Sequence, residues 1–123
     1  MPSERRMARI NEAIRERLSG VIQEEQDTNE TVLITILEVK TSVDVQWADV
    51  FVSIFPFEKR TLGMRYLEKN APHFQRLLNK KLPLRHTPKI RFHEDYRMQL
   101  GAYEHDEEDK EEQTKGEQEN VGT

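Results

Sequence analysis

The sequence has 123 residues, which is room for one compact domain and little else. It contains no cysteine, and this excludes disulfides, a thiolate nucleophile and cysteine-ligated zinc. It also contains neither an apolar run long enough to span a membrane nor the apolar stretch of a secretory signal, so we expect a soluble cytosolic protein.

The net charge of −4 conceals a segregation of charge along the chain. Residues 1–58 carry six Lys or Arg against eleven Asp or Glu, whereas residues 59–100 carry eleven against three, a balance of +8. Residues 104–123 carry two against nine, a balance of −7. A basic block of this kind is typical of a phosphate-binding surface. It is equally compatible with a solvated face whose acidic partners come from the first half of the folded chain.

Apolar residues at spacings of three and four predict an amphipathic helix from about Glu4 to Glu25, with Ser3 as its N-cap. Arginines at positions 5, 6 and 9 share this helix with glutamates at 4, 12 and 16. That mixture favours a solvent-exposed face over a nucleic-acid contact.

Residues 31–40 and 45–55 are rich in β-branched residues and predict two strands joined by a turn. Asp44 and Asp49 lie in or beside this turn and the strand edge, so turn hydrogen bonding is the ordinary explanation for these carboxylates. Strands so close in sequence should pair antiparallel, because a parallel return needs a long crossover. The second strand is apolar on both faces, with Val50, Val52 and Ile54 on one face and Trp47, Phe51 and Phe55 on the other. We therefore expect the main core on one face and partial cover on the other.

Residues 59–70 and 73–82 predict two helices, the first with Leu62, Tyr66 and Leu67 turned inward. Asn70-Ala71-Pro72 lies between them, and proline disfavours helical geometry in the residue before it. A kink or break is expected at Ala71, with Asn70 capping the second helix. The alternation of charged and apolar residues over 89–93 predicts a third strand with one buried face.

The predicted fold class is therefore α+β, in the order α-β-β-α-kink-α-β, with a three-stranded mixed sheet and the helices packed on one face. We assign residues 1–100 to this domain. Residues 101–123 are expected to form a disordered acidic C-terminal tail, because they are highly charged and have almost nothing to bury.

Three segments in this order resemble the ribosome-binding factor A family: ARINEAIRERLSGVIQ, ILEVKTSVDVQWADVFVSIF and LLNKKLPLRHTPKIRFHED. The match covers about residues 8–96. The most diagnostic residues are Val39, Ser42, Asp44, Ala48, Asp49, Val50, Phe51, Val52, Ser53, Leu82, Leu84, Arg85, Thr87, Pro88, Ile90, Phe92 and Asp95.

The resemblance implies a type II KH-like fold in which a helix–kink–helix replaces the glycine-rich KH loop. It also implies association with the free 30S subunit and its 16S rRNA during late assembly, near the 5′ end region. A role in maturation of precursor rRNA and in growth in the cold is implied as well.

One motif departs from the family, which builds its kink from alanine, any residue and glycine. Here Asn70-Ala71-Pro72 aligns with that motif, so proline replaces glycine. Proline is an equally good cause of a kink, but it has no N–H to offer to a phosphate at the helix end. The backbone N–H groups of residues 73–75 remain.

A KH-like domain grips the nucleic-acid backbone near the junction between two helices. The predicted RNA-binding residues surround this junction and continue to the last strand: Arg65, Lys69, Asn70, Ala71, His73, Arg76, Lys80, Lys81, Arg85, Lys89 and Arg91. The late lysines can alternatively complement a helix C-terminus, which is worth about 0.3–1 kcal/mol.

Regular spacing favours core packing over base stacking for the aromatic residues, with Trp47 as the best exception; the set is Trp47, Phe51, Phe55, Phe57 and Tyr66. The histidines at 73, 86, 93 and 105 match no metal-binding spacing, and the five glycines are isolated, so no phosphate-binding loop exists. We therefore expect no metal, no cofactor and no enzymatic activity.

The leading hypothesis is a monomeric ribosome assembly factor that binds RNA by shape and phosphate contact. The alternative is a protein–protein adaptor, whose acidic tail or helical face docks a basic ribosomal protein or a maturation GTPase. In either case seven net negative charges tethered beside a basic face can compete with RNA.

Overall fold

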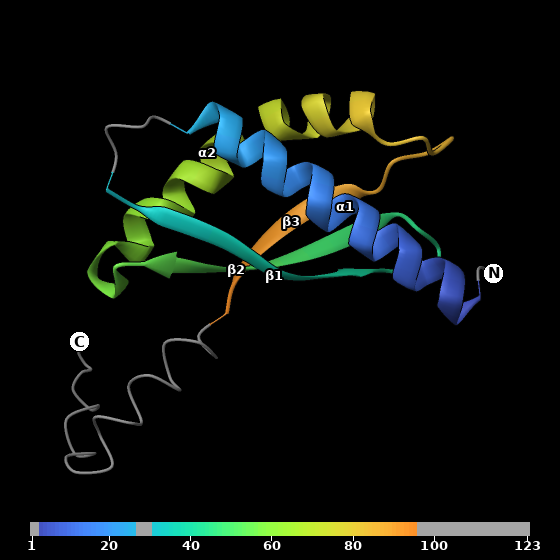
Figure 1. Ribbon diagram of the computed structural model, residues 1–123, viewed down its shortest axis with the longest axis horizontal. Coiled ribbons are helices and arrows are strands. Elements are labelled where there is room, and N and C mark those ends of the chain that lie inside the picture. The colour runs from blue at the N-terminus through green and yellow to red at the C-terminus, as the bar shows by residue number, and fades with distance from the viewer. Residues whose placement is uncertain (1–2, 27–30, 96–123) are drawn as a thin grey trace, which may run out of the picture.

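A computed structural model describes residues 3–26 and 31–95. The elements in chain order are α1 (Glu4–Glu25), β1 (Leu33–Thr41), β2 (Trp47–Phe55), the 3-10 turn η1 (Phe57–Lys59), α2 (Arg60–Lys81) and β3 (Lys89–Glu94). Figure 1 shows both helices on the same side of a three-stranded sheet. The α+β class with its helices on one face is confirmed.

The sheet has the order β1-β2-β3, so β2 is the central strand. β1 and β2 pair antiparallel, whereas β2 and β3 pair parallel because the chain returns through α2. The predicted mixed sheet is confirmed.

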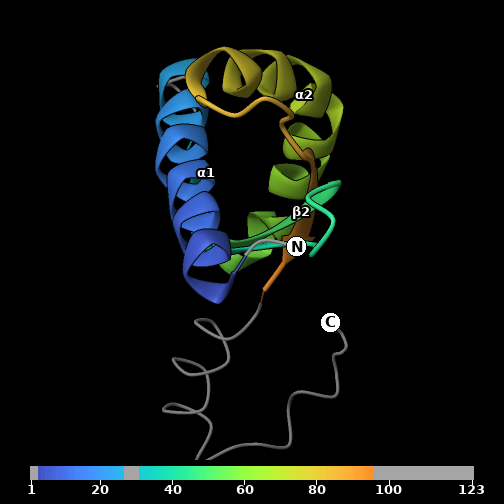
Figure 2. The ribbon, with the colours of Figure 1, turned by 90° about the vertical axis from the view of Figure 1, so that its right-hand side faces the viewer.

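The core lies between the helices and the inner face of the sheet, where alternate residues of β2 have no exposed surface. Seen from the end, α1 and α2 form the two sides of an arch over the sheet, and core side chains fill the space between them (Figure 2). Ser3 caps α1 as predicted, because its hydroxyl accepts a hydrogen bond of 3.2 Å from the Arg6 N–H. The core residues are Ile10, Ile14, Leu18, Val21, Ile22, Ile36, Val39, Ala48, Val50, Val52, Ile54, Leu67, Phe74, Leu78, Leu82 and Ile90.

No element within residues 3–26 and 31–95 covers the other face of the sheet, which we call the open face (Figure 1). Trp47 is 39% exposed and Phe55 67% exposed on this face. Core packing was the wrong prediction for Phe55, and also for Phe57, because helices cover only one side of the sheet. Leu62 was wrongly predicted to point inward; it is exposed, and the neighbouring Gly63 faces the core instead.

The two predicted helical segments form one continuous helix, α2, which includes Pro72. The helix bends between its two halves, as Figure 1 shows, so the kink is confirmed but the break is not. Pro72 is exposed, and its ring crowds the preceding turn on the outer side, so the helix bends toward the core. Asn70 is not a cap; its side-chain amide donates a hydrogen bond of 2.8 Å to the Tyr66 carbonyl inside the helix.

The prediction of a disordered acidic tail at 101–123 lies outside the described residues, and the domain boundary stays a prediction. Within the described part of the chain, neither helix has the length and apolar character needed to cross a membrane.

Candidate nucleic-acid interface

Four exposed cations follow one stripe of α2, at intervals of four, seven and four residues: Arg65, Lys69, Arg76 and Lys80. Residues at such intervals lie on the same side of a helix. The buried residues Leu67, Phe74 and Leu78 lie on the opposite side, so these cations point away from the sheet. None of the four forms an ion pair with a carboxylate of the described residues. We call this row the cationic stripe.

His73 ties α2 to α1 just beyond Pro72. Its Nε2 lies 2.9 Å from Oε1 of Glu25, and its Nδ1 lies 3.2 Å from a guanidinium nitrogen of Arg76. Both contacts fit a neutral ring that carries its proton on Nε2, so that Nδ1 accepts from Arg76. Of the residues predicted to bind RNA, His73 and Asn70 therefore have their side chains engaged within the fold, and Ala71 is half-buried.

Lys81 and Arg85 lie beyond the cationic stripe, at the end of α2 and in the loop that follows, and both are exposed. Neither pairs with a carboxylate among residues 3–26 and 31–95. They extend the positive charge of the stripe past the helix C-terminus.

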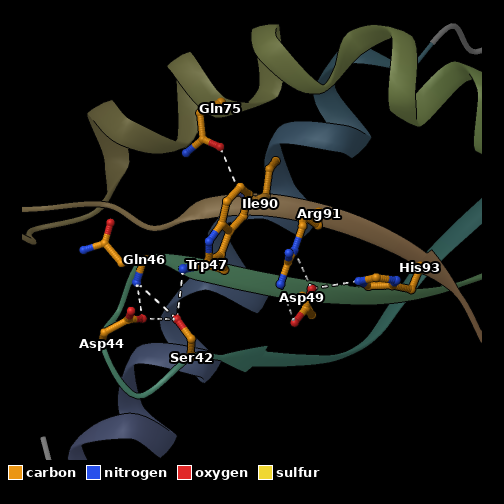
Figure 3. Close-up of polar contacts among 9 residues, drawn as sticks. All are labelled: Ser42, Asp44, Gln46, Trp47, Asp49, Gln75, Ile90, Arg91 and His93. Atoms are coloured by element: carbon orange, nitrogen blue, oxygen red, sulfur yellow. Dashed lines mark hydrogen bonds and ion pairs between the residues drawn. The ribbon is translucent and has the colours of Figure 1, made fainter. Parts of the chain in front are cut away.

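Gln75 fixes the return of this loop to the sheet. Its Oε1 accepts a hydrogen bond of 2.9 Å from the Ile90 N–H (Figure 3). Its Nε2 donates a hydrogen bond of 3.1 Å to the Pro88 carbonyl. The side-chain amide thus joins α2 to the edge strand β3. The sequence contains no signal for this role, because the partners lie 13 and 15 residues away.

Lys89 and Arg91 lie on the open face, because they alternate with the buried Ile90 along β3. The predicted RNA-binding residues are therefore divided between two sides of the molecule. The stripe lies on the helical side, and these two cations lie on the opposite face of the sheet.

Arg91 is paired on that face. Its guanidinium donates to both carboxylate oxygens of Asp49, at 2.9 and 3.3 Å, and lies 4.3 Å from the centre of the Trp47 ring. His93 donates from Nε2 to Asp49 at 2.8 Å and stacks on Phe51 with 5.1 Å between ring centres. Figure 3 shows Trp47, Arg91, Asp49 and His93 in a row along the strands.

Asp49 is ionised in this row. Desolvation raises the pKa of Asp49, but the hydrogen bonds from His93 and Arg91 lower it more, so the pKa lies below its ordinary value. The carboxylate therefore neutralises Arg91, which is not an unpaired cation. Cross-strand pairing, and not the predicted turn hydrogen bonding, explains Asp49. Nowhere in the described ranges do three His, Asp or Glu side chains gather to hold a metal ion.

The turn between β1 and β2 is built around the Ser42 hydroxyl. This oxygen accepts hydrogen bonds from the backbone N–H groups of Gln46 and Trp47, at 3.2 and 3.0 Å, and donates to Asp44 at 2.7 Å (Figure 3). The bond from Ser42 and a backbone bond from Gln46 hold the pKa of Asp44 below its ordinary value. Turn hydrogen bonding is thus the confirmed role of Asp44.

Comparison with known proteins gives a consistent result. The sequence profile of the family described as ribosome-binding factor A matches residues 6–106. The chain is 34% identical to ribosome-binding factor A of Acetivibrio thermocellus, over 80% of this chain and 81% of that protein. It is 35% identical to the namesake from Caldicellulosiruptor bescii, over 79% and 76% of the two chains.

Solved structures agree in fold. A proposed ribosome-binding factor A from Thermotoga maritima matches with a TM-score of 0.63 and 28% identity, over 77% of this chain and 92% of that one. The crystal structure of ribosome-binding factor A from Thermus thermophilus matches with a TM-score of 0.61 and 24% identity, over 72% and 94%. The fold is therefore KH-like, and the chain belongs to the ribosome-binding factor A family.

Proposed function

We propose that this protein is a ribosome assembly factor that binds the free, immature 30S subunit through contacts between the cationic stripe and the backbone of 16S rRNA. The observation that carries this proposal is the row of four exposed cations on the outer side of the bent helix α2. None of them is neutralised by a carboxylate of the described chain.

Such a row suits RNA recognised by its shape and its phosphates. Neighbouring cations one turn apart are separated by about 5–6 Å along a rigid helix, so each can meet a separate phosphate. Binding releases counterions from the RNA, and this release supplies most of the sequence-independent affinity. The protein would act by stabilising one conformation of the immature rRNA, with no bond made or broken.

The family supplies the partner in this proposal. A homology model of ribosome-binding factor A from Thermus thermophilus was fitted into a cryo-electron microscopy map of a complex between the 30S subunit and ribosome-binding factor A. We extend this to the present chain, and infer that it acts in the cytoplasm during late 16S rRNA maturation, including 5′ end processing, and supports growth in the cold. A monomeric state and contact with a maturation GTPase stay predictions.

The test is charge reversal of the stripe. A variant with Arg65→Glu, Lys69→Glu and Arg76→Glu is compared with one carrying Arg5→Glu, Arg6→Glu and Arg9→Glu on α1, which changes the net charge equally. Sedimentation with purified 30S subunits over a range of salt concentrations measures affinity. The α2 variant should bind more weakly, and its salt slope should fall by about one for each phosphate that it no longer binds.

The same experiment contains the result that would overturn the proposal. If the α2 variant is folded and keeps both the affinity and the salt slope of the unchanged protein, the stripe does not touch rRNA. A third variant, with Lys80→Glu, Lys81→Glu and Arg85→Glu, shows whether the contact continues past the helix end. Association that survives ribonuclease treatment of the subunit would instead favour the adaptor alternative.

A further inference from the structure

The open face carries an aromatic ring beside an unpaired cation at the point where β2 and β3 begin. Trp47 is 39% exposed there, and its register partner across the parallel strands is Lys89. Lys89 is exposed and pairs with no carboxylate of the described residues. The two side chains therefore leave neighbouring strands at the same level and on the same face of the sheet.

This ring is held in place in the protein alone, without a ligand. The backbone N–H of Trp47 donates to the Ser42 hydroxyl at 3.0 Å, and the backbone carbonyl of Trp47 accepts from the Ser42 N–H at 2.8 Å, so the backbone that carries the ring is fixed. Arg91 lies over the ring at 4.3 Å and is itself fixed by the Asp49 carboxylate. A side chain fixed in this way loses little conformational entropy on binding.

We propose that Trp47 stacks on an unpaired RNA base while Lys89 binds the adjoining phosphate. A nucleotide presents a flat base, which can stack on the ring, and a phosphate, which can pair with the cation. Aromatic residues interleaved with cations form the usual platform for single-stranded RNA, because every base can stack. An apolar peptide would match the ring but would leave the lysine without a partner.

This surface is distinct from the cationic stripe, because the stripe lies on the helical side of the sheet and Trp47 lies on the open face. The inference therefore adds a second contact of a different kind to the proposed function. The stripe binds phosphates of paired or unpaired RNA alike, whereas the open face selects unpaired bases.

The fold contains a matched control at the other end of the sheet. Phe57 follows β2, is also 39% exposed, and carries the Arg60 guanidinium 4.0 Å from its ring centre. The nearby Lys59 is not available in the same way, because it donates a hydrogen bond to the Thr31 hydroxyl. Phe57 thus has the same aromatic–cation geometry without an unpaired lysine beside it.

The experiment uses the full chain and two RNA probes of about ten nucleotides, an oligouridylate and a duplex of mixed sequence. Trp47 is the only tryptophan in the chain, so its fluorescence reports on this site alone. The oligouridylate should change the fluorescence, and Trp47→Leu should weaken its binding roughly ten-fold, while duplex affinity stays the same. Trp47→Phe should keep most of the affinity for oligouridylate, and Phe57→Leu should keep all of it. Lys89→Gln should lower the salt slope of oligouridylate binding by about one.

Three results would overturn the inference. The first is that a folded Trp47→Leu variant binds oligouridylate as tightly as the unchanged protein. The second is that Phe57→Leu loses as much oligouridylate affinity as Trp47→Leu. The third is that the fluorescence responds to ribonuclease-treated subunits but not to RNA. The last result would assign the open face to a protein partner. None of them bears on the stripe, because its charge-reversal variants are judged by 30S affinity and salt slope.

Discussion

Gln75 shows how one side chain can position a whole surface in this protein. Its amide accepts from the Ile90 N–H and donates to the Pro88 carbonyl, two backbone groups at the start of the edge strand β3. The same amide donates to the Asn79 side chain one turn further along α2, at 3.0 Å. The distance between α2 and the strand that carries Lys89 is therefore fixed by hydrogen bonds as well as by apolar packing.

Replacement of Gln75 should destabilise the fold. Gln75→Ala leaves the partly buried N–H of Ile90 and carbonyl of Pro88 without partners, so we expect the free energy of unfolding to fall by about 1–3 kcal/mol. Urea denaturation measures this change. Gln23→Ala on the exposed side of α1 is the matched control and should stay within about 0.5 kcal/mol of the unchanged protein. Equal stability of the two variants would show that the Gln75 amide does not hold β3.

At the scale of the element, α2 combines a bend with a close approach to the sheet. Pro72 lies on its exposed side, where its ring crowds the preceding turn and one N–H hydrogen bond is missing, so the helix bends toward the core. Gly63 lies on its buried side, where a Cβ atom would stand 2.9 Å from two carbons of Ile54. The first half of the helix therefore packs this closely against β2 because position 63 has no Cβ atom.

The two helical glycines should respond to alanine in opposite directions. Alanine is preferred over glycine in a helix by about 1 kcal/mol, and Gly20 of α1 has no other atom within 4 Å of the added methyl group. Gly20→Ala should therefore raise the free energy of unfolding by about 1 kcal/mol.

Gly63→Ala should lower the free energy of unfolding, because overpacking against Ile54 typically costs about 1–3 kcal/mol and exceeds the helix preference. Thermal and urea unfolding of both glycine variants test this contrast. Adding Ile54→Val, which removes one of the two close carbons, should recover part of the loss in Gly63→Ala. A Gly63→Ala variant as stable as Gly20→Ala would rule out the close packing of α2 on β2.

At the scale of the whole molecule, charge is distributed by side of the sheet as well as by position in the chain. The cationic stripe occupies the helical side, and the open face carries ion pairs, exposed aromatic rings and Lys89. The sequence adds a balance of −7 over residues 104–123, which is enough to reverse the sign of the net charge. Removal of those residues would change the net charge from −4 to +3.

A chain that ends at Tyr103 should bind RNA more tightly at low salt than the full chain, because tethered carboxylates compete with phosphates for the same cations. The difference should shrink as salt rises, since the screening length falls to about 10 Å at 0.1 M. Filter binding to an RNA duplex measures both effects. A full-length control with the nine acidic residues of 104–123 changed to Asn or Gln separates charge from bulk. Equal affinity of the full and shortened chains at low salt would end the idea of competition.

The sequence by itself determined the elements and the family. Local signals were sufficient for α1 with its Ser3 cap, for the two strands and for the third strand, because periodicity and capping depend on near neighbours in the chain. Pro72 was sufficient to predict the kink, although the helix continues through this residue. Three segments in the right order were sufficient to identify the family, because their residues match its pattern without any knowledge of how they pack.

Only the tertiary structure decided which predicted cations lie together. It joined the two predicted helical segments into one helix, so that Arg65, Lys69, Arg76 and Lys80 share one side, and it turned Lys89 and Arg91 to the other face of the sheet. It also paired Arg91 with Asp49, 42 residues away, and engaged His73 with Glu25, 48 residues away. Such contacts join residues far apart in the sequence, and no local pattern of residues specifies them.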